Sequence, residues 1–211
     1  MRTEDLIERL AREEESAVSV RSGVVAAWTP AFLATLVIML VGWGLRSGLG
    51  LALADPLVLA KIALPMLAAA MALAGGLELS RPEGHATRAL PGLGALGVAW
   101  LGLLTLDLAI TPPETWDEAL RGQTRLACLL SILALAVLPT AALLAALRRG
   151  ASPRPALSGA LAGLAGGAGA AAIYAFHCPE DAPLFYVTWY GTGIVIASAA
   201  GAVLGSRWLR W

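Results

Sequence analysis

Charged residues are scarce in this chain of 211 residues: Asp, Glu, Lys and Arg together make up 14% of it, whereas soluble domains carry roughly 25%. This deficit excludes an ordinary cytosolic globular domain and a disordered chain, because both need a charged surface. The 15 basic and 15 acidic side chains cancel, which argues against a protein that binds nucleic acid through a basic face. We therefore expect no direct nucleic-acid partner.

Motifs of catalytic chemistry are also missing. The chain has no Gly-rich phosphate loop, no HExxH pair and no recognisable set of Ser, His and Asp. Its two histidines, His85 and His177, fall on opposite sides of the membrane in the topology described below, so they cannot ligate one haem or one metal ion. We therefore expect that the protein is not an enzyme and that it needs no obligatory cofactor.

Long apolar stretches are what the chain does contain, and its hydrophobic content is 58%. A bilayer core about 30 Å thick needs roughly 20 mostly apolar residues of helix. Six segments meet this requirement: 24–44, 56–79, 89–110, 126–147, 156–176 and 184–204. The predicted fold class is therefore all-α. It comprises a polytopic six-helix membrane bundle over residues 24–204 with short loops, a cytoplasmic segment 1–23 with an amphipathic helix, and a cytoplasmic tail 205–211.

The positions of the basic residues predict the orientation of the bundle. Eleven of them fall in the N-terminal segment, in the loops after the second and fourth spans and in the C-terminal tail. The other four fall on the opposite side of the membrane. Because Lys and Arg are held back on the cytoplasmic side, both termini are expected in the cytoplasm.

The centres of the six spans contain no ionisable residue. Because a charge at the bilayer midplane is costly and is usually kept for transport, this argues against a proton-coupled pump. Lys61 lies near the start of the second span, and we expect its side chain to snorkel to the outer surface. A small permease or channel lined by polar backbone stays open as an alternative.

Glycines at helical spacing mark the fifth and sixth spans. Small residues let helix backbones approach closely in lipid, where packing drives association. Two interpretations remain: close packing within the bundle, and the seam of a homodimer. The residues concerned are Gly159, Gly163, Gly166, Gly167, Gly201 and Gly205.

Two cysteines lie near the same outer surface in this topology. Cys128 follows the start of the fourth span, and Cys178 lies where the fifth span emerges, in the loop HCPEDAP, which has no basic residue of its own. Three interpretations stay open. The pair forms a static disulfide; it responds to oxidants or, with His177, to a soft metal ion; or the two are unrelated buried thiols. A quinone-linked thiol oxidoreductase is disfavoured, because it would carry a CxxC pair.

The N-terminal segment is the part able to contact a cytoplasmic protein. Its apolar residues fall on one helical stripe, and the opposite face is charged. Six acidic against four basic side chains make residues 1–23 net acidic, which favours a basic protein partner over anionic lipid. The residues of the stripe are Leu6, Ile7, Leu10 and Ala11.

These features resemble one known family. The resemblance rests on TEDLIERLA at 3–11, RRGASPRPALSGALAGLAGG at 148–167, YAFHCPEDAPLFYVTWYGTGI at 174–194 and GSRWLRW at 205–211. These segments are similar to the NrsF-type membrane anti-sigma factors, which restrain extracytoplasmic-function sigma factors of the σF group in proteobacteria.

The resemblance implies a location and a function. It implies a multi-pass protein of the bacterial inner membrane whose cytoplasmic N-terminal segment binds the sigma factor, and whose Cys128 and Cys178 take part in sensing metal or oxidant stress. We then expect a change at Cys128, His177 and Cys178 to repack the fourth, fifth and sixth spans and to alter the availability of the N-terminal segment. A soft metal ion would be a signal rather than a cofactor. The partners would be the sigma factor, membrane lipid and, if the glycine seam is intermolecular, a second copy.

Overall fold

The computed structural model describes residues 3, 20–81 and 83–210, and it forms helices within them. The elements are α2 (Val20–Gly42), α3 (Leu49–Ala52), α4 (Pro56–Glu78), α5 (Ala89–Ile110), the 3-10 turn η1 (Pro113–Thr115), α6 (Trp116–Arg121), α7 (Arg125–Leu147), α8 (Pro155–Tyr174) and α9 (Pro183–Trp208). In this part of the chain, six helices are long and apolar enough to cross a membrane: α2, α4, α5, α7, α8 and α9. The predicted all-α polytopic fold is confirmed.

Some of the predicted span ends agree with the observed helix ends, and others do not. The second and third spans end within one residue of the predicted positions, whereas α9 continues to Trp208 and takes up most of the predicted tail 205–211. The predicted sigma-binding residues Leu6, Ile7, Leu10 and Ala11 lie outside the described residues.

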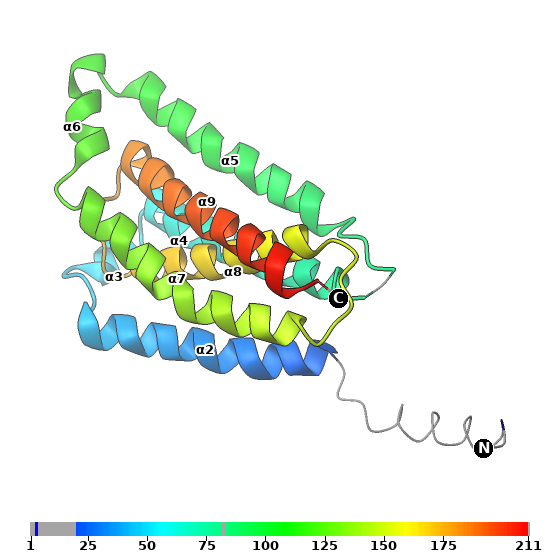
Figure 1. Cartoon of the computed structure of the whole chain (residues 1–211). Coiled ribbons are helices and arrows are strands. Elements are labelled where there is room, and N and C mark those ends of the chain that lie inside the picture. Colours follow the sequence, from blue (N-terminus) through cyan, green and yellow to red (C-terminus); the bar gives the residue numbers. More distant parts are fainter. Residues whose placement is uncertain (1–2, 4–19, 82, 211) are drawn as a thin grey trace.

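Helix α8 forms the centre of the bundle, with α4, α7 and α9 packed around it (Figure 1). Fifteen of its 20 residues are buried. Helix α2 packs mainly against α7, and α5 lies against α4 and α9 at the opposite edge. The two peripheral helices therefore bury much less of their surface within the chain than α8 does.

Glycines explain how α9 can lie so close to α8. A Cβ atom on Gly159 would collide with the carbonyl oxygen of Gly201, and one on Gly163 would collide with that of Ala197. Gly205 in turn meets the backbone of Gly159. These glycines therefore make their close contacts within the chain. This agrees with close packing within the bundle rather than with the seam of a homodimer.

The starts of three spans carry local signals for helix formation. Pro56, Pro155 and Pro183 each stand at the first helical position, where a missing N–H costs nothing. In α4 the side chain of Asp55 also accepts a hydrogen bond from the Leu57 N–H at 2.8 Å, which caps the helix. The starts of α4 and α9 lie at the same end of the bundle, where Tyr186 OH donates a hydrogen bond to the carbonyl oxygen of Leu57 at 3.4 Å.

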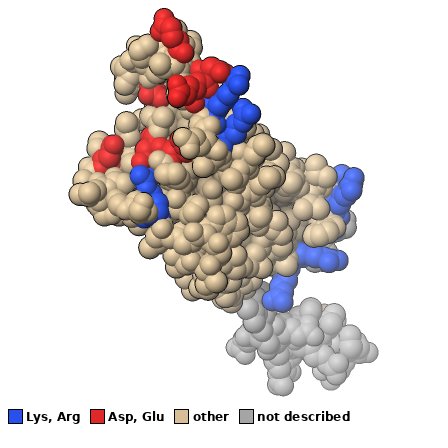
Figure 2. Space-filling view, turned by 90° about the vertical axis from the view of Figure 1, so that its left-hand side faces the viewer, with Lys and Arg blue, Asp and Glu red and all other residues tan. Residues whose placement is uncertain are grey.

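Charged side chains gather at the two ends of the molecule. Figure 2 shows a broad band without Lys, Arg, Asp or Glu between them. Within the described residues, the end where α2 begins and α9 ends has eight arginines and two glutamates, and the opposite end has seven carboxylates and four basic residues. Large apolar side chains such as Val41, Val98 and Val137 are exposed in the band, as expected for a surface that faces lipid.

Candidate functional site

The two cysteines meet at the end of the bundle opposite the termini. Cys128 lies in the first turn of α7, and Cys178 lies in the loop between α8 and α9. Both are completely buried in one hydrophobic cluster, and both are free thiols. Their side chains lie close enough for the Cys128 thiol to lower the pKa of Cys178. The structure therefore brings together two residues that are fifty positions apart in the sequence.

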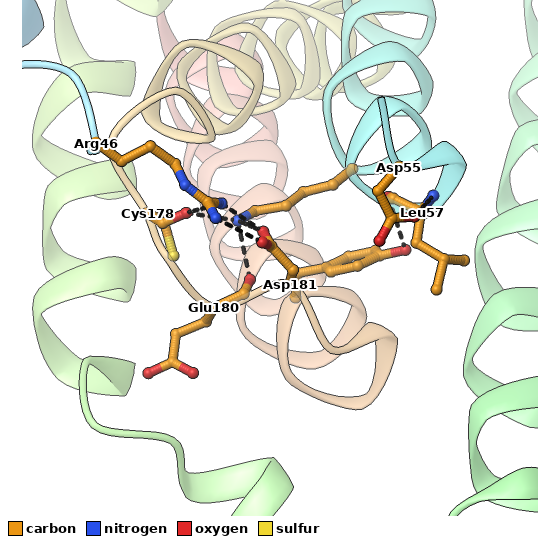
Figure 3. A network of polar contacts seen from close by, with 8 residues as sticks. Arg46, Asp55, Leu57, Cys178, Glu180 and Asp181 are labelled. Carbon is orange, nitrogen blue, oxygen red and sulfur yellow. Dashed lines mark hydrogen bonds and ion pairs between the residues drawn. The ribbon is translucent and has the colours of Figure 1, made fainter. Parts of the chain in front are cut away.

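Two cationic side chains hold the backbone of the Cys178 loop. The carbonyl oxygen of Cys178 accepts hydrogen bonds from Lys61 Nζ at 2.9 Å and from Arg46 Nη1 at 3.2 Å. Lys61 also donates to the carbonyl oxygen of Glu180 at 2.9 Å. Figure 3 shows the side chain of Arg46 pointing to the loop that contains Cys178, Glu180 and Asp181.

The same two cations pair with the carboxylate of Asp181. Arg46 donates two hydrogen bonds to it, each 2.7 Å long, in a bidentate arrangement, and Lys61 Nζ lies 3.2 Å from Asp181 Oδ1. We call Arg46, Lys61 and Asp181 the ion clamp. Its members come from the segment after α2, from α4 and from the α8–α9 loop, so it joins three parts of the chain.

One expectation from the sequence is wrong at this site. Lys61, the chain's single lysine, does not snorkel to the surface: it is 0% exposed and its ammonium points to the loop. The loop, which has no basic residue of its own, takes its basic partners from elsewhere in the chain, because Lys61 and Arg46 donate hydrogen bonds to its backbone. An unpaired charge in an apolar setting is costly, and the loop carbonyls and Asp181 remove that cost by binding the ammonium.

The clamp determines the charge state of the groups around it. Burial opposes ionisation of the Asp181 carboxyl, but the hydrogen bonds from Arg46 and the charge of Lys61 outweigh it and lower the pKa of Asp181. The hydrogen bond to Asp181 raises the pKa of Arg46. Both groups are therefore held in their charged forms.

Cys178 is the thiol that this environment activates. A hydrogen bond from the Cys128 thiol, helped by the nearby charge of Lys61, lowers the pKa of Cys178 below the ordinary thiol value, although burial opposes the shift. The thiolate is the nucleophilic and metal-binding form of cysteine. The pair can thus react with an oxidant and close a disulfide, or supply two sulfur ligands to a soft metal ion.

His177 does not join the two cysteines. Its Nδ1 lies 3.2 Å from the carbonyl oxygen of Gly44, and its ring packs against Tyr174 at a centroid distance of 5.5 Å. No group of three His, Cys, Asp or Glu side chains arranged to hold a metal ion occurs in the described part of the chain. The three-ligand set of Cys128, His177 and Cys178 is therefore not assembled here, whereas the two-sulfur pair is.

The end of α2 is fastened to both cysteine-bearing segments. The N–H of Arg46 donates to the carbonyl oxygen of Phe176 at 3.0 Å, two residues before Cys178. Trp43 Nε1 donates to Ser131 Oγ at 3.0 Å, three residues after Cys128 on α7. These contacts connect the thiol pair to the helix that follows the N-terminal segment.

Further polar contacts fix the start of α9. Asp107 Oδ2 accepts a hydrogen bond from the Leu184 N–H at 2.7 Å. Trp189 Nε1 donates to the carbonyl oxygen of Leu120 at 2.7 Å, and Trp100 Nε1 donates to that of Val187 at 3.2 Å. The last contact accounts for a tryptophan that lies deep in its span, away from the membrane interface.

Comparison with known proteins identifies the family. The family described as NrsF, negative regulator of sigma F, matches residues 10–211. Over 218 residues, the chain is 36% identical to the "Probable anti-sigma-F factor NrsF" of Azospira oryzae, and the alignment covers 100% of both chains. No solved structure matches the chain. The resemblance predicted from the motifs is confirmed, and the chain belongs to the NrsF family of negative regulators of sigma F.

Proposed function

We propose that this protein is an anti-sigma factor of the bacterial inner membrane. Its cytoplasmic N-terminal helix sequesters an extracytoplasmic-function sigma factor through Leu6, Ile7, Leu10 and Ala11, and a periplasmic oxidant or soft metal ion acting at Cys128 and Cys178 releases it. The observation that carries the proposal is the buried thiol pair in a chain whose full length matches a family of sigma-factor regulators.

The charge distribution supports the orientation that this function needs. Among the described residues, the end where α2 begins and α9 ends is strongly basic, and the end with the thiol pair carries more carboxylates than basic residues. Because basic residues are retained on the cytoplasmic side, the sigma-binding segment then lies in the cytoplasm. The thiol pair faces the periplasm, where oxidants and metal ions arrive first.

The chemistry of the pair supports a thiol-based signal. The two thiols are buried in one cluster, and the pKa of Cys178 is lowered, so the pair offers an oxidant both a nucleophile and a resolving thiol. A soft cation finds two sulfur ligands. Either event would have to favour one conformation by a few kcal/mol to act as a switch.

Helix α2 offers a route from this signal to the N-terminal segment. Its outer end contacts the Cys178 loop through Arg46 and contacts α7 through Trp43. The helix begins at Val20, inside the N-terminal segment 1–23. We therefore add α2 to the fourth, fifth and sixth spans as a helix expected to move when the thiols react.

A promoter-reporter experiment with the full-length protein tests both halves of the proposal. We expect Leu6→Glu/Leu10→Glu to abolish repression and co-purification of the sigma factor, because the apolar stripe would be lost. We expect Cys128→Ser and Cys178→Ser to repress normally but to lose induction by oxidant or metal. Retained binding in the first variant would contradict the docking surface, and normal induction in both cysteine variants would contradict the sensor. Membrane insertion of each variant is the control.

A further inference from the structure

Two residues outside the cysteine pair converge on Cys178, Lys61 from α4 and Arg46 from the segment after α2. We propose that Arg46 and Lys61 are positioning residues of the thiol pair: through the ion clamp they hold the backbone of Cys178 where its sulfur meets Cys128. This inference rests on the proposed sensing role of the cysteines, and it adds the residues that make the pair competent to react.

The contacts of Lys61 fix the loop at three successive points. An ammonium group has three N–H donors, and here they reach the carbonyl oxygens of Cys178 and Glu180 and the carboxylate of Asp181. Lys61 is fully buried in the second turn of α4. The position of the loop relative to α4 is therefore set by one side chain that has little freedom to move.

Arg46 fixes the same loop from the other side. Its guanidinium shares the Cys178 carbonyl oxygen and the Asp181 carboxylate with Lys61, and its own N–H binds Phe176. The N–H of Cys178 donates to the carbonyl oxygen of Tyr174 at 3.1 Å. Both peptide groups of Cys178 are thus held, which leaves its sulfur only the freedom of the side chain.

Geometry matters for this pair because sulfur chemistry is directional. A disulfide needs Cα atoms within roughly 7 Å and a dihedral angle near 90°, and a misplacement of about 1 Å can slow a reaction by about two orders of magnitude. A buried ion pair adds little net stability compared with apolar residues of the same volume, and its best-attested use is to fix one arrangement. The clamp suits that use, since all its contacts converge on the residues next to the reacting sulfur.

The rate at which the two thiols close a disulfide tests the proposal. Diamide is a suitable oxidant: the Cys178 sulfur adds to one nitrogen of its N=N bond while the other nitrogen takes a proton. The Cys128 sulfur then attacks the Cys178 sulfur and displaces the hydrazine, which takes the second proton. Two electrons pass from the thiols to diamide. Because the chain has two cysteines, a maleimide that adds mass to each free thiol reports the reaction after denaturation.

The experiment uses the full-length protein in native membrane vesicles, without the sigma factor. We expect Lys61→Met and Arg46→Met to close the disulfide at least roughly tenfold more slowly than the wild type, and Lys61→Arg to restore the rate to within a few-fold. The matched control is Arg121→Met. Arg121 forms an exposed ion pair with Asp117 at 2.8 Å at the same end of the molecule, and its loss is expected to leave the rate unchanged.

Folding is controlled in two ways. Each variant must elute as a single species in detergent, and Asp181→Asn, at a partly exposed position, provides a milder break of the clamp. The proposal is overturned if folded Lys61→Met and Asp181→Asn oxidise at the wild-type rate, or if the wild type forms no intramolecular disulfide. A failure of the promoter experiment would contradict sensing without changing these rates, so the two proposals fail separately.

Discussion

Helices α8 and α9 are held together in different ways at their two ends. Toward the end with the termini, glycine backbones touch directly, as Gly159 meets Gly201 and Gly163 meets Ala197. At the opposite end, the loop between the helices is held by Arg46, Lys61 and Asp181. The first contact depends on shape and contains no group that titrates or reacts. The second depends on charge and lies next to a reactive thiol pair.

This contrast indicates that the two ends of the helix pair differ in their sensitivity to chemical change. The backbone contacts between glycines do not respond to pH or to oxidants, because the dispersion attraction between close atoms does not depend on either. The clamp can be loosened by protonation or by movement of Cys178. The glycine contacts therefore fix how α8 and α9 pack, and the clamp is the part of the helix pair that a change of charge would loosen.

The largest expected effect comes from breaking the glycine contacts. In Gly163→Leu the new side chain would have to displace the backbone of Ala197 and Ser198, so we expect a loss of more than about 3 kcal/mol and little folded protein in detergent. The matched control is Gly102→Leu, since nothing lies within 4 Å of a Cβ at Gly102 on α5. Gel filtration and thermal unfolding measure both. Equal behaviour of the two variants would show that close packing of α8 and α9 is not required.

A smaller effect is expected from the clamp, and it depends on pH. Loss of the charged partner in Asp181→Asn should cost roughly 1.5–3 kcal/mol at neutral pH. Because the pKa of Asp181 is lowered by folding, from an ordinary value of 3.8, its contribution is complete above that value and is lost as the pH falls through the folded pKa. The difference in thermal stability between the wild type and Asp181→Asn should therefore vanish in acid.

The pH series also separates the clamp from the rest of the molecule. The other carboxylates titrate in both proteins, so their contributions cancel in the difference in thermal stability between the wild type and Asp181→Asn. Asp117→Asn, which breaks an ion pair whose side chains are 61% and 70% exposed, should show almost no difference at any pH. A difference for Asp181→Asn that persists unchanged in acid would mean that packing, and not charge, accounts for it.

The sequence predicts the scaffold well and the clamp poorly. Span positions follow from local composition, so the segments 56–79 and 89–110 match α4 and α5 almost residue by residue. The common location of Cys128 and Cys178 follows from topology alone. Lys61 and Asp181, by contrast, are 120 positions apart, and no local pattern links them.

One signal in the sequence could have indicated the clamp. A loop with two carboxylates and a thiol but no base faces the same side as Arg46 and Lys61, and charges near an apolar core need partners. The snorkelling rule led to a different expectation, because it treats a lysine near a span end as isolated in lipid. A loop that folds back over the helix end provides a closer partner than the membrane surface.

The smallest expected effect concerns the fastening of α2. Trp43→Phe removes the hydrogen bond from Nε1 to Ser131 Oγ, which should cost about 1 kcal/mol and speed amide hydrogen exchange at residues 43–46 and 131. The matched control is Trp28→Phe within α2, since Trp28 Nε1 has no hydrogen-bond partner within the described residues. Faster exchange in the first variant alone would show that the outer end of α2 is held by a polar contact near Cys128. Equal exchange in both would leave Arg46 as the contact that ties α2 to the thiol pair.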